Sequence, residues 1–149
     1  MKTVGDPGAL ADLRARVERL SPDAGRKWGK MNVQQMLSHI AVAMEWVTGD
    51  GEARPWPRKP SKLVKLMALR VPLPWPKGIP NPMNPAGAQV APEEFEGLRQ
   101  RVLAGLDTMS RWETTDRTPP HPAFGPMSTW EWRRWAWKHA NHHLTQFGA

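Results

Sequence analysis

Three histidines carry the chemistry that this chain is best suited to perform. His139 and His143 are four residues apart in a segment predicted to be helical, so their side chains lie on one helix face, about 5 to 6 Å apart at Cβ. That spacing lets both rings bind one metal ion if a third ligand is supplied from elsewhere. His39, beside the apolar stripe of another amphipathic segment, is the candidate for that ligand. The pattern predicts two ligands from one helix and a third from another.

The other histidines leave alternatives open. His142 lies three residues after His139, a spacing at which these two rings could also converge. His121 lies in a proline-flanked loop, where we expect it to anchor the loop first and to face a pocket second. His39, taken alone on an apolar helix, is also compatible with a hydrogen-bonded core histidine that binds nothing.

A site of three neutral imidazoles has a specific chemical consequence. It leaves the remaining positions of the ion to water or substrate, which is typical of catalytic rather than structural zinc. Such an ion lowers the pKa of a bound water to about 7 or binds a thiolate, and either gives a nucleophile at neutral pH. The sequence offers no clear general base, because Glu131 is explained by helix capping and Glu45 lies off the face of His39. Gln35 and Gln146 are candidates to orient the ligands.

Four helices are predicted to position these residues. Apolar residues recur at helical spacing in four segments that have starting or ending signals, namely residues 7–20, 33–49, 92–109 and 128–147. Asn32 with Gln35, and Ser128 with Glu131, form capping boxes at the starts of the second and last helices. We find no internal repeat and no convincing strand, so the fold class is all-α.

The segment between the second and third helices is long and rich in proline. Prolines recur from Pro55 to Pro92, and only Ser61 to Arg70 is free of them, where a short amphipathic helix is predicted. A helix bundle with one long crossover accommodates such a connection, and it lets the second and third helices run parallel. The residues between Glu52 and Glu93 include seven Lys or Arg and no acid, so the whole net charge of +7 lies there. This basic stretch could attract nucleic acid, membrane phosphates or an anionic small molecule, or be a solvated loop.

Composition limits the other possibilities. The 149 residues, 40% of them apolar, suit a single domain covering residues 1–149. Cysteine is absent, so any thiol must come from a cofactor or substrate. The N-terminal residues lack the apolar core of a signal peptide, and no apolar stretch approaches the roughly 20 residues that span a bilayer. We therefore expect a cytoplasmic protein without a membrane partner.

Tryptophan is abundant near the predicted site. Four of the nine tryptophans lie in the last predicted helix, which must therefore be covered on several sides. Trp132 and Trp135 lie on its histidine side and are candidates to line an apolar pocket, with Trp56 and Trp75 of the crossover as a lid. Tryptophans among basic residues also suit nucleic-acid stacking, but the basic stretch is broken by prolines and contains no recognised module, so we do not expect that partner.

Three motifs resemble those of a known family. In order along the chain they are residues 26–39 (RKWGKMNVQQMLSH), 121–126 (HPAFGP) and 139–148 (HANHHLTQFG). They resemble the DinB-like superfamily of metal-binding four-helix bundles, and most closely a subfamily of unknown function within it.

The resemblance implies a fold and a ligand set. It implies a four-helix bundle with a long proline-rich crossover between helices 2 and 3, and a divalent metal, zinc or nickel, at His39, His139 and His143. It further implies a metal-dependent enzyme of the transferase or hydrolase type that uses a low-molecular-weight thiol, with a small and anionic thiol or substrate held by the basic crossover. The alternatives are a non-catalytic metal-binding stress protein, or an interaction module that binds an anionic partner through the crossover. A homodimer is compatible with each.

Overall fold

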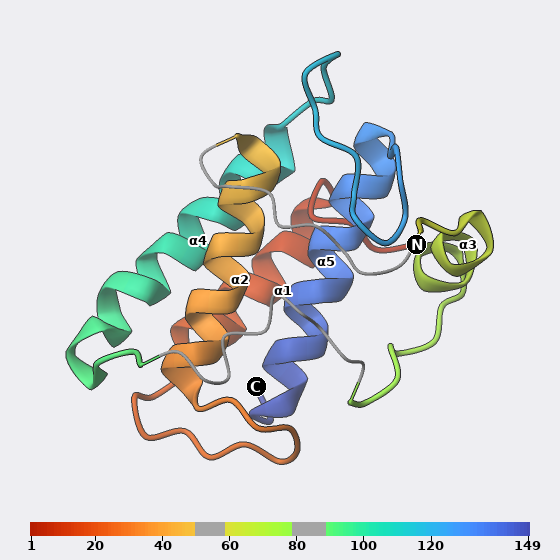
Figure 1. Ribbon diagram of the computed structural model, residues 1–149. Helices are drawn as coiled ribbons and strands as arrows, with labels where there is room; N and C mark the ends of the chain where they lie inside the picture. The colour runs from red at the N-terminus through yellow and green to blue at the C-terminus, as the bar shows by residue number, and fades with distance from the viewer. Residues whose placement is uncertain (50–58, 79–88) are drawn as a thin grey trace.

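Helices are the only regular secondary-structure elements in the part of the chain that the structure describes. The computed structural model describes residues 1–49, 59–78 and 89–149. In chain order the helices are α1 (Pro7–Glu18), α2 (Val33–Thr48), α3 (Lys62–Arg70), the short 3₁₀ helix η1 (Pro92–Glu94), α4 (Phe95–Arg111) and α5 (Thr129–Gln146). The helices α1, α2, α4 and α5 form a bundle (Figure 1), which confirms the predicted all-α four-helix class.

Both helices that carry the clustered histidines start at the predicted capping boxes. At α2, the Asn32 side chain accepts a hydrogen bond from the Gln35 amide at 2.8 Å, and the Gln35 side chain accepts one from the Asn32 amide at 2.9 Å. At α5, Ser128 and Glu131 form the corresponding bonds at 3.3 and 2.9 Å. Each box satisfies two backbone N–H groups that the first helical turn leaves unpaired. These starts fix the positions of the histidines along their helices.

The bundle helices run in two directions. In Figure 1, α1 and α5 run one way, and α2 and α4 run the other way. α2 packs chiefly on α4, and the two are parallel, as the long connection between them predicts. Gly105 of α4 allows the close approach, because a Cβ built there would lie 3.0 Å from the sulfur of Met44. The core contains aliphatic and methionine side chains of all four helices, among them Leu13, Met36, Ile40, Met44, Leu106 and Leu144.

α3 lies outside the bundle, against the first half of α5. The Ser61 side chain caps it by accepting a hydrogen bond from the Val64 amide at 3.3 Å, which confirms the helix predicted in the proline-free stretch. Leu69 is its one buried residue, and Lys65 pairs with Glu131 of α5 at 3.2 Å. Residues 71–78 form no regular helix or strand, and the remainder of the predicted crossover, residues 50–58 and 79–88, lies outside the described residues.

The main differences from the predicted helix boundaries are at the end of α1 and at the start of α4. α1 ends at Glu18, two residues before the predicted end at Leu20, whose side chain nevertheless packs in the core. Residues Pro92–Glu94 form a separate 3₁₀ turn, in which the Glu94 side chain accepts a hydrogen bond from the Ala91 amide at 2.9 Å, and α4 follows it. Within the described ranges, every helix is too short or too polar to cross a lipid bilayer.

Candidate metal centre

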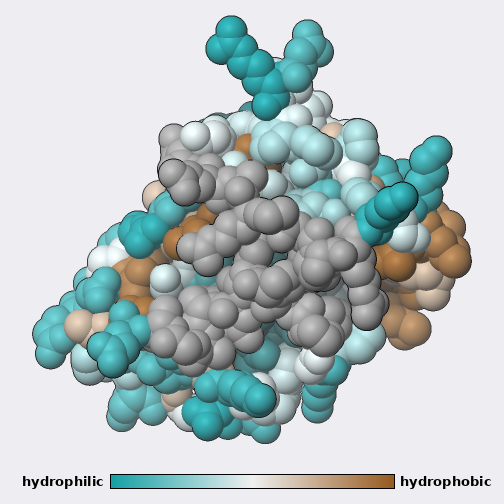
Figure 2. All heavy atoms as spheres, in the orientation of Figure 1, coloured by the Kyte–Doolittle hydropathy of each residue, from teal (hydrophilic) through white to brown (hydrophobic). Residues whose placement is uncertain are grey.

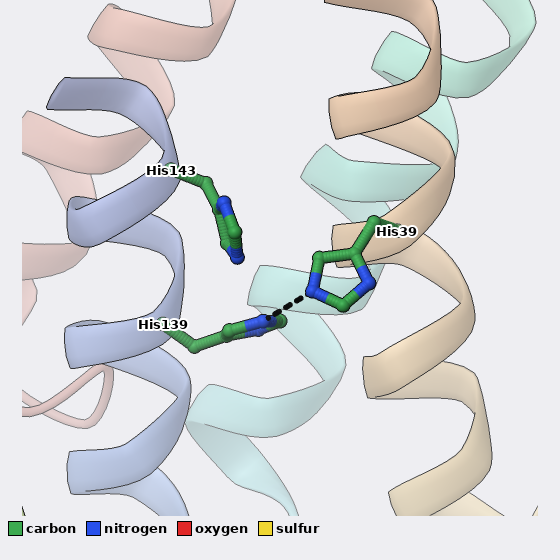
Figure 3. A group of neighbouring side chains, drawn as sticks. All are labelled: His39, His139 and His143. Atoms are coloured by element: carbon green, nitrogen blue, oxygen red, sulfur yellow. Dashed lines mark hydrogen bonds between the residues drawn. The ribbon is translucent and has the colours of Figure 1, made fainter. Parts of the chain in front are cut away.

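Three histidines from two helices converge between α2 and α5. His39 comes from α2, and His139 and His143 come from successive turns of α5 (Figure 3). Their ring centroids are 4.7 to 4.8 Å apart, and one nitrogen from each ring lies within 4.8 Å of the others. The structure therefore brings together the three residues that the sequence predicted as ligands.

The distance between the His39 and His139 nitrogens fits two donors to one metal ion. With metal–nitrogen bonds of about 2.0 to 2.1 Å, two donors lie about 2.9 Å apart at a right angle and about 3.4 Å apart at the tetrahedral angle. The Nε2 atoms of His39 and His139 are 2.9 Å apart and share a hydrogen bond, in which one of them carries the proton. The ring of His143 points toward the same space (Figure 3). The ligand nitrogens of the three rings lie within 4.8 Å of one another, so the three side chains could hold one ion if the rings moved closer together.

Burial keeps the three imidazoles neutral. His39, His139 and His143 are 7, 6 and 8% exposed. Burial lowers the pKa of His39 to about 4 and that of His143 to about 3, and it lowers the pKa of His139 well below the ordinary value of 6.5. Repulsion between neighbouring histidines acts in the same direction. Neutral imidazole is the form that binds a metal, so no proton has to leave the cluster at pH 7.

Gln146 fixes the orientation of His143. Its side-chain oxygen lies 2.7 Å from Nδ1 of His143, so Nδ1 carries the proton and donates it to that oxygen. The lone pair of the other ring nitrogen is then available to the cluster, as is usual for metal-binding histidines. Of the two glutamines predicted to orient ligands, Gln146 takes this position. The side-chain oxygen of Gln35 instead accepts the Asn32 amide at the start of α2.

Aromatic rings hold His139 in place. Trp135 stacks on it with centroids 4.9 Å apart and planes inclined by 15°, and Trp75 lies 6.3 Å away on a tilted plane. These contacts agree with the predicted positions of Trp135 beside the histidines and of Trp75 against them, whereas Trp56 lies outside the described residues. Nδ1 of His139 is buried and has no hydrogen-bond partner within the described part of the chain. Packing therefore orients this ring without fixing which nitrogen is protonated.

Trp132 lies next to Trp135, as the sequence predicted, but its ring does not contact the three clustered histidines. Trp132 is completely buried. Its ring centroid lies 6.0 Å from that of Trp46, 5.6 Å from that of His121 and 5.5 Å from that of Trp135. None of the described ring contacts joins it to the three clustered histidines. It supports Trp135 from behind, and Trp135 forms the wall of the site.

His142 lies beside the cluster but contributes no nitrogen to it. Its ring packs edge-on against Trp28, with centroids 4.9 Å apart, and lies 6.0 Å from Trp75. Lys77 lies 5.4 Å above the Trp28 ring. Of the two candidate partners of His139 on α5, the structure places His143 in the cluster and His142 outside it.

His121 anchors its loop, as the sequence predicted. Its Nδ1 accepts hydrogen bonds from the amides of Ala123 and Phe124 at 3.1 and 3.3 Å, and its ring stacks on Phe124 at 4.2 Å. Its backbone pairs with Gly125 in both directions. Burial lowers the pKa of His121 to about 3, so this ring is neutral as well.

The two glutamates considered as general bases, Glu131 and Glu45, form hydrogen bonds and ion pairs away from the cluster. Glu131 closes the α5 capping box and pairs with Lys65, and Glu45 accepts hydrogen bonds from Arg101 at 2.7 and 2.5 Å. Within the described residues, the cluster contains histidines and no carboxylate.

Lys138 is a residue of this region that the sequence did not single out. Its buried ammonium group donates hydrogen bonds to the carbonyl oxygens of Ala68, Val71 and Leu73 at 2.8, 3.0 and 3.0 Å, and burial lowers its pKa to about 8. Trp75 donates its indole N–H to the same Ala68 carbonyl at 2.9 Å. Lys138 thus ties the segment that carries Trp75 to α5, beside the cluster. The burial of Lys138 could have been predicted from its position among tryptophans, on a helix that had to be covered on several sides.

A comparison with models of protein families shows which family the chain belongs to. The model of the DinB superfamily matches residues 8–147. The chain belongs to the DinB superfamily. The matched residues include the three clustered histidines and both capping boxes of this DinB-superfamily protein. No curated protein and no solved structure matches the chain.

Proposed function

We propose that this DinB-superfamily protein binds one divalent metal ion, zinc or nickel, through His39, His139 and His143. The observation that carries the proposal is the convergence of three buried, neutral imidazoles from two helices onto one space. Their donor type suits zinc and nickel, both of which accept imidazole readily.

The hydrogen bonding of the cluster favours a bound ion over a purely structural role. Buried polar atoms are nearly always paired, and a partly paired buried cluster is costly. Here the described bonds are the one between His39 and His139 and the one from His143 to Gln146, while Nδ1 of His139 has no described partner. If the proton between the two Nε2 atoms of His39 and His139 moved to the Nδ1 atom of its own ring, both Nε2 lone pairs would be free to bind an ion. Binding of an ion would explain why three imidazoles are kept together at this cost.

We further propose a metal-dependent enzyme of the thiol-dependent transferase or hydrolase type. When bound, the ion would supply a Lewis acid with open positions for water, thiol or substrate. Gln146 would hold the His143 ring so that its metal-binding nitrogen faces the ion. Trp75 and Trp135 would limit access of water to the cluster. The thiol would have to be supplied from outside, because the chain has no cysteine.

A small anionic substrate or thiol is supported by the charge beside the cluster. Lys77 is exposed and lies over Trp28, whose ring packs against His142 next to the three histidines. A positive charge at that place favours the approach of an anion.

Non-catalytic metal binding is a second candidate. The lack of a carboxylate among the described residues of the cluster favours it, because no evident group takes up a proton. Turnover of thiol-containing substrates by the metal-loaded protein separates the two candidates.

Metal content tests the proposal. The protein is purified without chelators or a metal-affinity step, incubated with zinc or nickel, desalted and measured by elemental mass spectrometry. We expect about one equivalent in the wild type, none in His39→Ala, and about one in the control His142→Ala, whose imidazole lies outside the cluster. A wild type without metal, or His39→Ala with the wild-type content, would refute the site.

A further inference from the structure

The outer face of α3 is apolar and exposed. Leu63, Leu66 and Met67 share this face with Arg70, because they follow the i, i+3, i+4, i+7 spacing of one helix face. Together with Val64 and Leu73 they form what we call the α3 patch, whose five apolar residues are 51 to 68% exposed. In Figure 2 the hydrophobic colour gathers at the right edge of the molecule, where Figure 1 places α3.

This exposure is concentrated in one place. Among the described residues, the only other large hydrophobic side chains that are exposed are Met1 and Val42, one at the chain start and one on α2. Single exposed apolar residues need no explanation, whereas five on one short helix and the residues after it mark a contact surface.

α3 is firmly held with this face outward. Its opposite side buries Leu69 and pairs Lys65 with Glu131 at 3.2 Å. From α5, Arg134 donates to the carbonyl oxygen of Leu69 at 3.0 Å, and Lys138 binds three more carbonyl oxygens at the end of the helix. Because these bonds use the inner side of α3, the outer apolar face cannot turn inward without breaking them.

The charged residues next to the α3 patch along the chain are all basic. Lys59, Lys62, Arg70 and Lys77 are exposed next to it in the chain, and the sequence contains no acid between Glu52 and Glu93. A second copy of this chain would bring these cations together, so self-association through the patch is disfavoured. An anionic surface with an apolar layer beneath it matches both features, and the patch lies on a helix at the edge of the molecule (Figures 1 and 2).

We propose that α3 docks the protein on the surface of an anionic lipid bilayer. The α3 patch inserts among the first acyl carbons, and the flanking Lys and Arg contact the phosphate headgroups. This proposal departs from the sequence-based expectation of no membrane partner, because a contact in the plane of the surface needs no spanning segment. The inference does not depend on the metal centre.

Vesicle flotation tests the proposal with the full chain at low salt. One set of vesicles contains phosphatidylcholine alone, and the other contains phosphatidylcholine with phosphatidylglycerol. We expect binding to the second set, weakening as salt rises, and a loss of about tenfold or more in Leu66→Glu. Val42→Glu is the matched control, since it adds the same charge at a residue that is 46% exposed on α2, and it should bind like the wild type. Circular dichroism establishes that both variants are folded.

Several results would overturn the proposal. One is no wild-type binding to the anionic vesicles, and another is equal binding by Leu66→Glu and the wild type, which would leave only adsorption of basic residues. Binding lost equally in Val42→Glu would show a general charge effect. Self-association in sedimentation velocity that Leu66→Glu abolishes, without vesicle binding, would assign the patch to a second copy of the chain.

Discussion

Two buried histidine environments in this protein differ in how their ring nitrogens are used. In the loop, Nδ1 of His121 accepts two backbone amides and its ring stacks on Phe124. In the cluster, His39 and His139 bond to each other, and Nδ1 of His139 has no partner among the described residues. Burial makes both environments neutral. Burial therefore sets the protonation state of these rings, whereas the pairing of their nitrogens distinguishes a loop anchor from a candidate ligand.

Acid provides the largest test of what the two environments share. The pKa values of His39, His143 and His121 lie at about 4, 3 and 3, below the ordinary 6.5, so the unfolded chain takes up protons that the folded chain refuses. The stability of the metal-free protein should therefore be complete above pH 6.5 and fall as the pH drops toward 4, by up to about 1.4 kcal/mol per pH unit for each buried histidine.

Urea unfolding of the metal-free protein at several pH values measures this loss. In His121→Asn the free energy of unfolding should fall less steeply with decreasing pH, by the contribution of one histidine. The reason is that the pKa of the loop histidine is lowered like those of the clustered histidines. A stability that stays constant between pH 7 and pH 4 would contradict the neutral state of both environments.

Removal of one clustered ring should separate the environments most clearly. His143→Ala removes one donor, and we expect zinc affinity to fall about 150-fold, or about 3 kcal/mol, which is the contribution of one ligand to the free energy of a zinc site. His121→Asn should bind zinc like the wild type. Competition with a chromophoric chelator measures both affinities. Similar losses in the two variants would mean that the cluster is no more a metal site than the loop is.

Stability should show the opposite pattern. His121→Ala removes the acceptor of the Ala123 and Phe124 amides and leaves a cavity, so the free energy of unfolding should fall by about 2 kcal/mol. His121→Asn should lose less stability than His121→Ala, because the asparagine side-chain oxygen can lie near the position of Nδ1 and accept the same amides. Urea unfolding without metal gives both values. An unchanged stability in His121→Ala would remove its role as an anchor.

The smallest effect concerns the one hydrogen bond that orients a clustered ring. Gln146→Leu removes the acceptor of the His143 Nδ1 proton, and zinc affinity should fall about tenfold. Gln146→Glu keeps an acceptor at that position and should bind at least as tightly as the wild type. The same chelator competition measures both. Equal affinities in the leucine and glutamate variants would show that orientation by Gln146 does not contribute.

Local sequence signals predicted much of the fold and the cluster. The capping boxes at Asn32 and Ser128 and the spacing of His139 and His143 are properties of short segments, and the structure has them as predicted. The choice between His142 and His143 was different, because both lie near the same helix face. It depends on where α2 crosses α5, which is a property of packing.

Residues that act across the molecule were harder to predict. Lys138 is buried because the end of α3 lies over it, and Trp132 lies behind Trp135 because Trp46 and His121 fill the space beside it. Periodicity gives the faces of a helix but not the partners that reach each face, so these positions were not evident from the sequence.

X-ray absorption spectroscopy of the zinc- or nickel-loaded protein tests the central claim most directly, because it counts the imidazoles bound to the ion. We expect three imidazole nitrogens at about 2.0 to 2.1 Å in the wild type and one fewer in His143→Ala, with the remaining positions filled by water oxygen, or by sulfur when a thiol is added. A wild-type spectrum with an oxygen shell and fewer than three imidazoles, or one that is unchanged in His143→Ala, would contradict it.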